Sequence, residues 1–461
     1  MCSDHYRKEK DTLGEVLVPS EAYYGSQTQR AVLNFQISGK HLPRSFIRAQ
    51  GLIKAAAAIT NMEVGKLPPD VGQAIVDASN EVTEGKWDQH FVIDVYQAGA
   101  GTSQNMNANE VIANRATELL AGSLGSSFRV HPNDHVNMAQ STNDTFPSAL
   151  HIAAAEQIVH QLLPAIQTLE QALETKATEF MSILKSGRTH LHDAVPMRLG
   201  QEFSGYAGTI QSMYRALEKS LDSLYELGLG GNAIGTPINT HPDYPQKVIT
   251  EICRRTNMPF RAPTNIFSFM QNRNAAFRTM SILKELAVHL IKMTSDLRLL
   301  SSGPRTGLSE ITLPPVQPGS TIMPGKVNPA ILEMIHMVSC QVIGYETAIA
   351  TAGMAGQLEI NVMMPVIAHT LLESIELLTN ALPVLVSKCI NGIQANEEVC
   401  KTWMESSLSL VTGLSPSMGY DLAAQIGMQA DLENKTLTQV LEELGLMNEN
   451  VKKEIDPNRM L

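Results

Sequence analysis

The side chains best able to do chemistry gather in one segment that cannot be helical. In GSTIMPGKVNP, residues 319–329, two glycines and two prolines enclose Ser320, Lys326 and Asn328. The glycines allow backbone conformations that other residues avoid, and the prolines stiffen the chain, so the segment can move while keeping its shape. Ser320 is a candidate nucleophile or base, Lys326 a clamp for an anion, and Asn328 a neutral hydrogen-bond donor.

A second segment combines small residues with a hydroxyl. AGAGTSQNMNANE, residues 98–110, places Thr102 directly after a Gly-Ala-Gly turn. It breaks the helical periodicity around it, so we expect irregular structure there. Backbone N–H groups and a hydroxyl that point to one place suit a carboxylate or a phosphate.

A third segment, HPNDHVNMAQSTNDTFP at residues 131–147, also breaks the helical pattern and contains adjacent polar side chains. Three of these are neutral, Ser141, Thr142 and Asn143. We expect them partly to cap a helix that begins near Phe146. Three polar groups are more than one cap requires, and together they could grip a carboxylate and a neighbouring hydroxyl or amine.

A histidine supplies the remaining candidate. SGRTHLHDA, residues 186–194, places Thr189 and His190 at the expected end of a helix that starts after residue 150 and terminates at Gly187. The HxH spacing with His192 resembles a metal pair, but no matching cysteine or carboxylate set accompanies it. The sequence therefore predicts no metal site.

These candidates describe an active site of neutral donors with one lysine and one histidine. Such a set would bind a small dianion and stabilise the charge that develops on a carboxylate when a neighbouring proton is removed. The chain has no GxSxG hydrolase elbow and no Walker loop. GLGGNAIG, residues 228–235, follows a helical pattern rather than a strand, so it is not a dinucleotide-binding fingerprint.

Long apolar stripes must position these segments. Apolar residues recur at helical spacing over about 152–173, 277–300, 329–351 and 361–385. Long helices with few strand signals predict an all-α fold built on an elongated central helical bundle. We divide the chain into an N-terminal domain (1–139), the central bundle (140–395) and a small helical C-terminal domain (396–461).

Composition narrows the possible partners and the cellular location. The 461 residues carry a net charge of -11, from 35 basic and 46 acidic side chains, without a basic tract, which argues against nucleic acid and anionic membranes. Five cysteines, Cys2 among them, lack CxxC spacing, as in a reducing compartment. The N-terminus does not resemble a signal or transit peptide, and no apolar run approaches the ~18 residues of a membrane span. We expect a cytoplasmic protein.

Taken together and in this order, the polar segments resemble the fumarase/aspartase superfamily over essentially the whole chain. GSTIMPGKVNP is similar to the specific signature GSSxMPxKxNP, and GRTHLHDA and HPNDHVN match companion segments of that family. The resemblance implies an all-α fold, a mobile 319–329 loop, no cofactor, and a homotetramer whose active sites each collect segments from three subunits.

The resemblance also implies residue roles. Ser320 would be the base that removes a proton from C3 of the substrate, and His190 would assist with Thr189 beside it. Glu333 matches the acidic residue that pairs with the histidine. The carboxylates of a small dicarboxylate substrate would be held by Thr102, Ser141, Thr142, Asn143, Lys326 and Asn328, and a secondary dicarboxylate site would contain His131, Asn133 and Asp134.

Two branches of the family remain open. GQEFSGY, GYDLAAQI and the terminal DPNRML resemble fumarate hydratases, whereas GAGTS, QSTND and AGQLEINVMMPV resemble aspartate ammonia-lyases. The departures at Ala100 and Thr142 lie within the pocket motifs. On balance the resemblance implies reversible anti addition of water to fumarate through an aci-carboxylate, a tricarboxylic acid cycle reaction, with elimination of ammonia from aspartate as the alternative. A catalytically idle scaffold of the crystallin type is disfavoured because Ser320, His190, Lys326 and Asn328 are all present.

Overall fold

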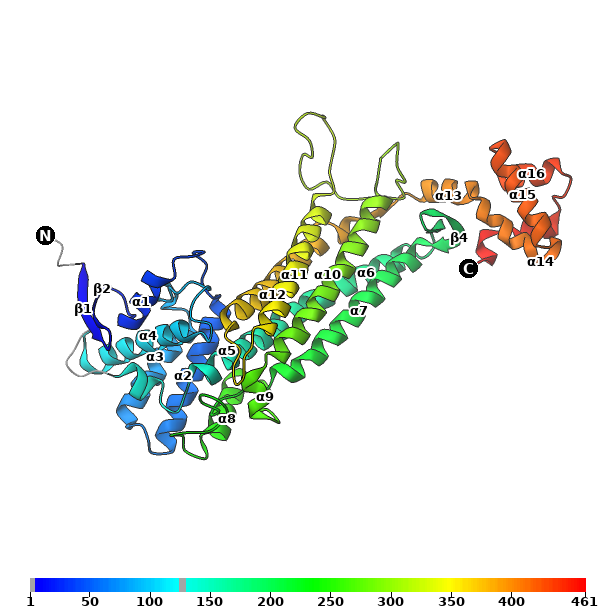
Figure 1. Ribbon diagram of the computed structural model, residues 1–461. Coiled ribbons are helices and arrows are strands. Elements are labelled where there is room, and N and C mark those ends of the chain that lie inside the picture. The colour runs from blue at the N-terminus through cyan, green and yellow to red at the C-terminus, as the bar shows by residue number, and fades with distance from the viewer. Residues whose placement is uncertain (1–4, 124–129) are drawn as a thin grey trace. The chain divides into compact units, whose positions relative to one another are not determined.

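Helices make up most of the chain in the computed structural model, which describes residues 5–123 and 130–461 (Figure 1). Cys2 lies outside the described residues. The chain divides into two compact units, described separately below: unit 1 contains residues 1–164, 215–285 and 340–379, and unit 2 contains residues 165–214, 286–339 and 380–461. The predicted all-α class is confirmed, with short two-stranded sheets as its β-structure in the described residues.

Unit 1 starts with a hairpin and continues with helices. Its elements are β1 (Tyr6–Asp11), β2 (Gly14–Pro19), α1 (Ser26–Asn34), α2 (Arg44–Glu63), α3 (Pro69–Thr83), η1 (Asp88–His90), α4 (Thr102–Ala121), η2 (Pro132–Val136), α5 (Thr142–Gln157), η3 (Ile158–Leu162), α8 (Tyr244–Thr256) and α9 (Ile266–Gln271).

Unit 2 holds the other two sheets and a series of short C-terminal helices. Its elements are α6 (Leu163–Glu179), which begins at the unit boundary, β3 (Leu184–Thr189), β4 (His192–Arg198), β5 (Ile311–Thr312), η4 (Ile390–Gly392), β6 (Gln394–Ala395), α13 (Glu397–Ser406), η5 (Leu408–Leu414), α14 (Ser415–Met418), α15 (Tyr420–Glu433), α16 (Leu437–Glu443), α17 (Glu449–Glu454) and η6 (Pro457–Arg459). Four further long helices have residues in both units: α7 (Leu199–Leu224), α10 (Asn274–Leu300), α11 (Ala330–Met354) and α12 (Met364–Lys388).

The long apolar stripes form helices where the sequence predicted them. The pattern at 277–300 is α10, those near 329–351 and 361–385 are α11 and α12, and that at 152–173 runs from α5 through η3 into α6. Helix α12 begins three residues later than predicted because the Asn361 side chain donates to the Ala352 carbonyl and accepts from the Met363 N–H. The backbone before Met363 is thereby held in a turn.

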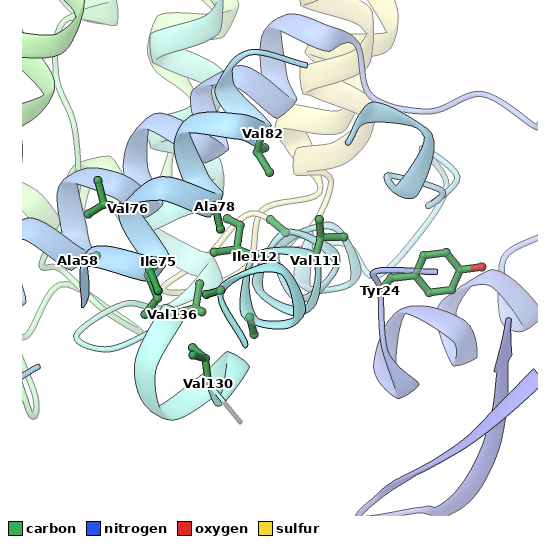
Figure 2. Close-up of a cluster of buried hydrophobic side chains, with 14 of the residues drawn as sticks. Tyr24, Ala58, Ile75, Val76, Ala78, Val82, Val111, Ile112, Val130 and Val136 are labelled. Carbon is green, nitrogen blue, oxygen red and sulfur yellow. The ribbon is translucent and has the colours of Figure 1, made fainter. Parts of the chain in front are cut away.

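The core of unit 1 shows how one helical stripe is buried. Along α3, Val71, Ile75, Ala78 and Val82 recur at a spacing of three or four residues, and all four are buried. They belong to one cluster with apolar residues of α2 and α4, including Ile112 (Figure 2). At roughly 25 cal/mol per Å² of apolar surface removed from water, this burial holds the three helices together.

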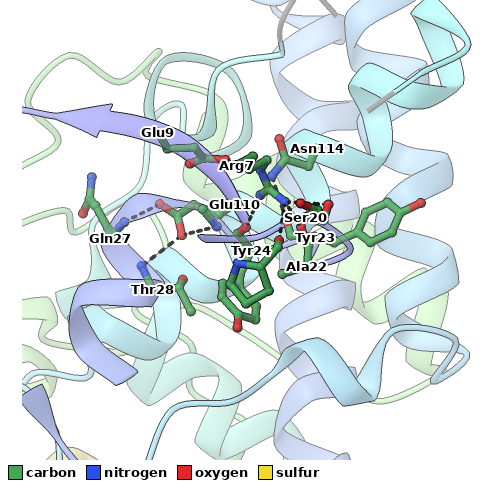
Figure 3. Close-up of polar contacts among 12 residues, drawn as sticks. Arg7, Glu9, Ser20, Ala22, Tyr23, Tyr24, Gln27, Thr28, Glu110 and Asn114 are labelled. Atoms are coloured by element: carbon green, nitrogen blue, oxygen red, sulfur yellow. Dashed lines mark hydrogen bonds and ion pairs between the residues drawn. The ribbon is translucent and has the colours of Figure 1, made fainter. Parts of the chain in front are cut away.

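Two charged residues, one on the N-terminal hairpin and one on α4, bind the chain segment that leads from β2 into α1 (Figure 3). Arg7, on β1, donates from its guanidinium to the carbonyls of Pro19, Ala22 and Tyr24 at 2.7 to 2.9 Å. The buried Glu110 carboxylate, on α4, accepts N–H groups from Gly25, Gln27 and Thr28. Burial raises the pKa of Glu110 and the three donors oppose that shift. The start of α1 is therefore hydrogen-bonded to α4.

Two predicted irregular segments are largely helical, so that expectation was wrong. Within 98–110, α4 starts at Thr102, and within 131–147, α5 starts at Thr142 rather than near Phe146. Asn, Ser and Thr disfavour helices in isolation. Here their side chains are buried and bonded across the fold, as in the bond of the Asn107 amide to the His90 carbonyl at 2.8 Å, and tertiary contacts override propensity. The 319–329 segment is irregular, as predicted.

One segment, Met364–Gly392, is long and apolar enough to cross a membrane by length and composition alone, which the sequence analysis did not expect. More than half of its most apolar window is buried within the chain. Its buried residues include Ile367, Leu371 and Leu378. These lie along one stripe, so the segment has the pattern of a helix in a protein core.

Gly101 permits α4 to start against α5, and this can be tested with the glycine at the other end of the same helix. Gly101 has φ +83° and a Cβ there would overlap the Phe146 ring, whereas Gly122 has φ +75° and open space. We expect Gly101→Ala to lower the free energy of unfolding by about 3 kcal/mol or more, from strain plus overpacking.

The matched variant Gly122→Ala has backbone strain alone, so we expect it to cost about 1 kcal/mol. Urea unfolding at one fixed protein concentration measures both changes. Equal losses for the two variants would show that the contact with Phe146 does not limit the position of α4.

Candidate active site

The N-termini of α4 and α5 meet in unit 1 and bring Thr102 together with the Ser141–Asn143 run. The Asn105 side chain, one turn into α4, donates from Nδ2 to the Thr142 Oγ1 at 3.1 Å. A helix N-terminus leaves backbone N–H groups unpaired and carries partial positive charge. Two such ends side by side attract an anion without a cationic side chain.

Ser141 caps α5, as the sequence predicted. The helix itself starts at Thr142, four residues before the expected start near Phe146. The Ser141 Oγ accepts the Asn143 N–H at 3.2 Å, and the Asp144 carboxylate accepts the Ser141 N–H at 3.0 Å, which completes a capping box. Since the Ser141 oxygen already accepts a bond, its own proton remains available to a ligand.

The glycine-rich segment 228–235 fixes this helix end from the other side. The second Asp144 oxygen accepts the N–H groups of Gly230 and Asn232 at 3.2 and 2.9 Å, and the Asn143 amide donates to the Ala233 carbonyl at 2.8 Å. Burial raises the pKa of Asp144 to about 7 against the effect of these donors. The segment follows helix α7, as predicted, and it holds the start of α5.

A buried lysine lies behind the two helix ends, and the sequence analysis missed it. Lys54, in the middle of α2, is 1% exposed, and its Nζ donates to Asn105 Oδ1, Asn137 Oδ1 and Gln140 Oε1 at 2.9 to 3.0 Å. Burial lowers the pKa of Lys54 to about 7, and attraction to Asp144 opposes that shift. A single lysine inside the apolar run IKAAAAI was the available signal, because a helix that is apolar all round is buried.

The segment with Thr189 and His190 is a β-hairpin, so the predicted helix ending at Gly187 was wrong. Strand β3 pairs with β4 in antiparallel register, with Thr189 opposite His192. His190 and Leu191 form the two-residue turn with φ of 57° and 61°, the conformation that matches the twist of a hairpin. Lys185 is buried within β3, which removes the apolar alternation that signals a strand.

Buried charges anchor this hairpin in unit 2. The Glu310 carboxylate is fully buried and lies 2.7 Å from Arg188 Nη1 and 3.0 Å from Lys185 Nζ. Lys185 also contacts Glu202 at 2.7 Å. Arg188 is two residues from His190, so the exposed turn is supported by a charged network at its base.

The 319–329 loop is closed by its own hydrogen bonds. The Gly319 N–H donates to the Lys326 carbonyl at 3.1 Å, and the Asn328 amide donates to the Gly319 carbonyl. The Ser320 Oγ accepts the N–H groups of Ile322 and Met323 at 3.3 and 2.8 Å. Lys326 is exposed, and no ion pair engages it within the described residues.

The remaining predicted residues are exposed or partly exposed. Glu333, at the start of α11, has Arg298 at 4.0 Å as its ion-pair partner. His131 accepts the Asp134 N–H at 3.0 Å on Nδ1, next to a cavity of about 660 Å³ in unit 1 that His131 and Asn133 line. Throughout the described residues, no three His, Cys, Asp or Glu side chains are grouped as metal ligands would be.

The predicted residues thus form separate groups in one chain. Thr102 and Ser141–Asn143 lie together in unit 1, while the His190 turn and the Ser320 loop belong to unit 2. Within the described parts of unit 2, no hydrogen bond joins His190 to Ser320 or to Glu333. The pairing of His190 with Glu333 stays a prediction.

Comparison with family models matches most of the chain. A model described as lyase matches residues 14–344, and a model described as fumarase C C-terminus matches residues 410–461. The two matched regions contain every residue to which the sequence analysis assigned a role.

Several named proteins are similar over nearly their full length. The fumarate hydratase class II of Nitrosomonas europaea is 45% identical over 99% of both chains, and that of Neisseria meningitidis is 47% identical over 96% of both. The mitochondrial fumarate hydratase of Danio rerio is 46% identical over all of this chain and 91% of its own. The class II fumarase structure from Schistosoma mansoni matches with a TM-score of 0.96 at 37% identity, over 99% of both chains.

The buried carboxylate under the hairpin generates a stability prediction. Glu310→Gln keeps the shape but leaves Lys185 and Arg188 with less compensating charge, and we expect a loss of about 3 kcal/mol in the free energy of unfolding. Glu449→Gln is the control, because Glu449 pairs with Lys452 at 3.0 Å and both side chains are exposed, and such pairs contribute less than about 1 kcal/mol. Urea unfolding compares the two, and equal small losses would contradict the anchoring role of Glu310.

Proposed function

This chain belongs to the lyase family of the class II fumarate hydratases, and on that premise we propose that it catalyses the reversible anti addition of water to fumarate, giving L-malate. The observation that carries the proposal is the pair of helix N-termini at Thr102 and Ser141–Asn143. They offer neutral donors and partial positive charge to a small dicarboxylate. Lys326 and Asn328 would hold the carboxylates from the loop side.

Ser320 would remove the C3 proton of malate. A serine is a weak base, but its oxygen accepts two backbone N–H groups, from Ile322 and Met323, and these favour the alkoxide form. Loss of the C3 proton places the electron pair on the adjacent carboxylate as a dianionic aci-form, which aligned donors stabilise. The C2–O bond then breaks as the C2–C3 double bond forms, and the leaving hydroxyl takes up one proton, which balances the proton removed from C3, and departs as water. His190 and Thr189 would orient the substrate.

Elimination of ammonia from aspartate shares the proton abstraction and differs in the leaving group. Ala100 and Thr142 carry the aspartase-like differences in the pocket motifs. Fumarate formation is therefore measured in parallel from L-malate and from L-aspartate, by ultraviolet absorbance of fumarate. We expect an increase with malate. An increase with aspartate alone would contradict the hydratase and make these two positions the candidates for leaving-group choice.

We also propose a homotetramer with shared active sites. Helix α11 presents an exposed stripe of apolar and small residues, Met337, Cys340, Gly344, Thr347 and Met354. A Cβ at Gly344 would meet no atom within 4 Å in this chain, so another helix can approach closely there. Exposed apolar stripes of this length support association with further copies.

A cytoplasmic location and a tricarboxylic acid cycle role belong to the same proposal. The four cysteines in the described residues are free thiols, which supports a reducing compartment. The division into 1–139, 140–395 and 396–461 stays a prediction, as does the secondary dicarboxylate site at His131, Asn133 and Asp134.

The role of Ser320 generates a kinetic prediction. Ser320→Ala removes the base, and we expect kcat for malate to fall by about 10² to 10⁴ while the assembly is retained. Thr321→Ala, which removes the neighbouring exposed hydroxyl, should stay close to wild type. Wild-type turnover by Ser320→Ala would remove Ser320 from the mechanism.

A mixing experiment extends this prediction to the shared sites. Ser320→Ala and His190→Asn are each expected to be nearly inactive as pure proteins. When the two are unfolded, mixed and refolded, assemblies with sites drawn from different subunits contain some sites with both native residues. Recovered activity is expected, and a mixture as inactive as its components would contradict sites that combine subunits.

A further inference from the structure

Among the described residues, the buried Lys54 ammonium donates hydrogen bonds only to amide oxygens. An ammonium has three N–H donors and no acceptor. Its three bonds go to Asn105, Asn137 and Gln140, at 2.9, 3.0 and 2.9 Å. Lys54 therefore has no N–H left for a substrate, and it acts only through the side chains it holds.

These bonds tie together the three chain segments that form the pocket in unit 1. Asn105 belongs to the first turns of α4, Asn137 follows η2, and Gln140 directly precedes Ser141. The segments come from distant parts of the sequence, 51 to 86 residues from Lys54. One charged atom thus sets the spacing between the helix end at Thr102 and the helix end at Ser141.

The same bonds decide which way the Asn105 amide faces. Because the ammonium only donates, Asn105 must direct its Oδ1 toward Lys54, and its Nδ2 then points to Thr142 Oγ1 at 3.1 Å. The Thr142 oxygen is thereby an acceptor on its inner side. Its proton is directed away from Asn105, and a hydroxyl in this state can donate to a carboxylate.

We propose that Lys54 is a positioning residue that orients the Asn105 amide so that the Thr142 hydroxyl is committed to donate its proton to a substrate carboxylate. The proposal rests on the proposed function, since it assigns Thr142 to a dicarboxylate. It goes beyond it by naming the chain Lys54, Asn105, Thr142 that fixes the donor direction. A carboxylate is thus bound by a neutral hydroxyl whose orientation a buried charge determines.

The decisive variant is Asn105→Asp, which reverses the donor direction with almost no change of shape. The aspartate gives Lys54 a charged partner but loses the bond from Asn105 Nδ2 to Asn137 Oδ1 at 3.2 Å, so the thermal midpoint should stay close to that of wild type. It offers Thr142 an acceptor in place of a donor, so the Thr142 proton turns inward and no longer reaches the substrate. A purely structural role for Lys54 and Asn105 predicts unchanged kinetics in this stable variant.

We expect KM for malate to rise about 10- to 100-fold, the effect of losing one hydrogen bond to a charged group. The change in kcat should be much smaller, because the bond is made in both the ground state and the transition state. Thr142→Val should show the same rise, and Asn105→Asp/Thr142→Val should be no worse than either single variant. Wild-type KM in Asn105→Asp, or additive effects in the double variant, overturns the proposal.

A second double-mutant cycle tests Lys54 itself, with Thr102 as the control residue. In the background of Lys54→Met, Thr142→Val should have little further effect, whereas Thr102→Val should keep its full effect, because no hydrogen bond links Thr102 to the Lys54 cluster in the described structure. Full additivity of Lys54→Met with Thr142→Val overturns the proposal. If Lys54→Met does not fold, the Asn105→Asp cycle decides alone.

These experiments test the proposed function and the role of Lys54 separately. Wild-type turnover of malate is measured first and tests the proposed function. The ratios between variants and wild type then test the role of Lys54. An active wild type with unchanged Asn105→Asp kinetics rejects the positioning chain and leaves the hydratase intact.

Discussion

The pocket in unit 1 depends on one costly interaction, the burial of the Lys54 ammonium where the ends of α4 and α5 converge. A buried charge is tolerated only when its hydrogen-bonding groups are satisfied. Three amide oxygens meet that requirement, and each belongs to a segment that carries or borders a predicted substrate contact. The positions of Thr102, Ser141 and Thr142 are therefore consequences of satisfying a group that touches no substrate. Helix α4 starts close to α5 at Gly101, where a Cβ would overlap the Phe146 ring.

Unit 2 also buries charged groups, and there the buried charges have opposite signs and pair with each other. Glu310 is fully buried and compensated by Lys185 and Arg188, and the exposed His190 turn rises directly from that pair. In both units the groups proposed to meet the substrate are exposed or at a helix end, while the groups that hold them are buried and charged. Such a division suits catalysis, because an exposed side chain is precise only when its supports are rigid. The 319–329 loop differs, since the hydrogen bonds of Gly319, Ser320 and Asn328 lie within the loop itself.

The spacing of apolar residues in the sequence predicted most of the long helices. It predicted few of the buried polar contacts that hold the site residues in place. The stripes that became α10, α11 and α12 were readable because each keeps one apolar face over many turns. The hairpin at β3 and β4 was not, since Lys185 is buried within it and pairs with Glu310, which lies far along the chain. The early starts of α4 and α5 were missed for the same reason: Asn107 in α4 and Asp144 in α5 form tertiary hydrogen bonds that propensity does not contain. The motif residues were found from their types and spacing and from the resemblance to a family. Lys54 and Glu310 belong to no motif, and only their contacts in the fold identify them.

The donor directions in unit 1 bear on the choice of leaving group. Ser141 and Thr142 each accept a hydrogen bond from within the chain, so each presents a proton to the pocket. Asn143 donates one amide N–H to the Ala233 carbonyl and keeps its second N–H and Oδ1 for a ligand. A pocket with this balance favours carboxylate and hydroxyl oxygens over an ammonium, which needs several acceptors at once. The absence of a hydroxyl at Ala100 removes one donor, and the inward bond from Asn105 makes Thr142 the more important of those that remain. The aspartase-like residues thus lie in a pocket whose hydrogen-bond polarity favours loss of water.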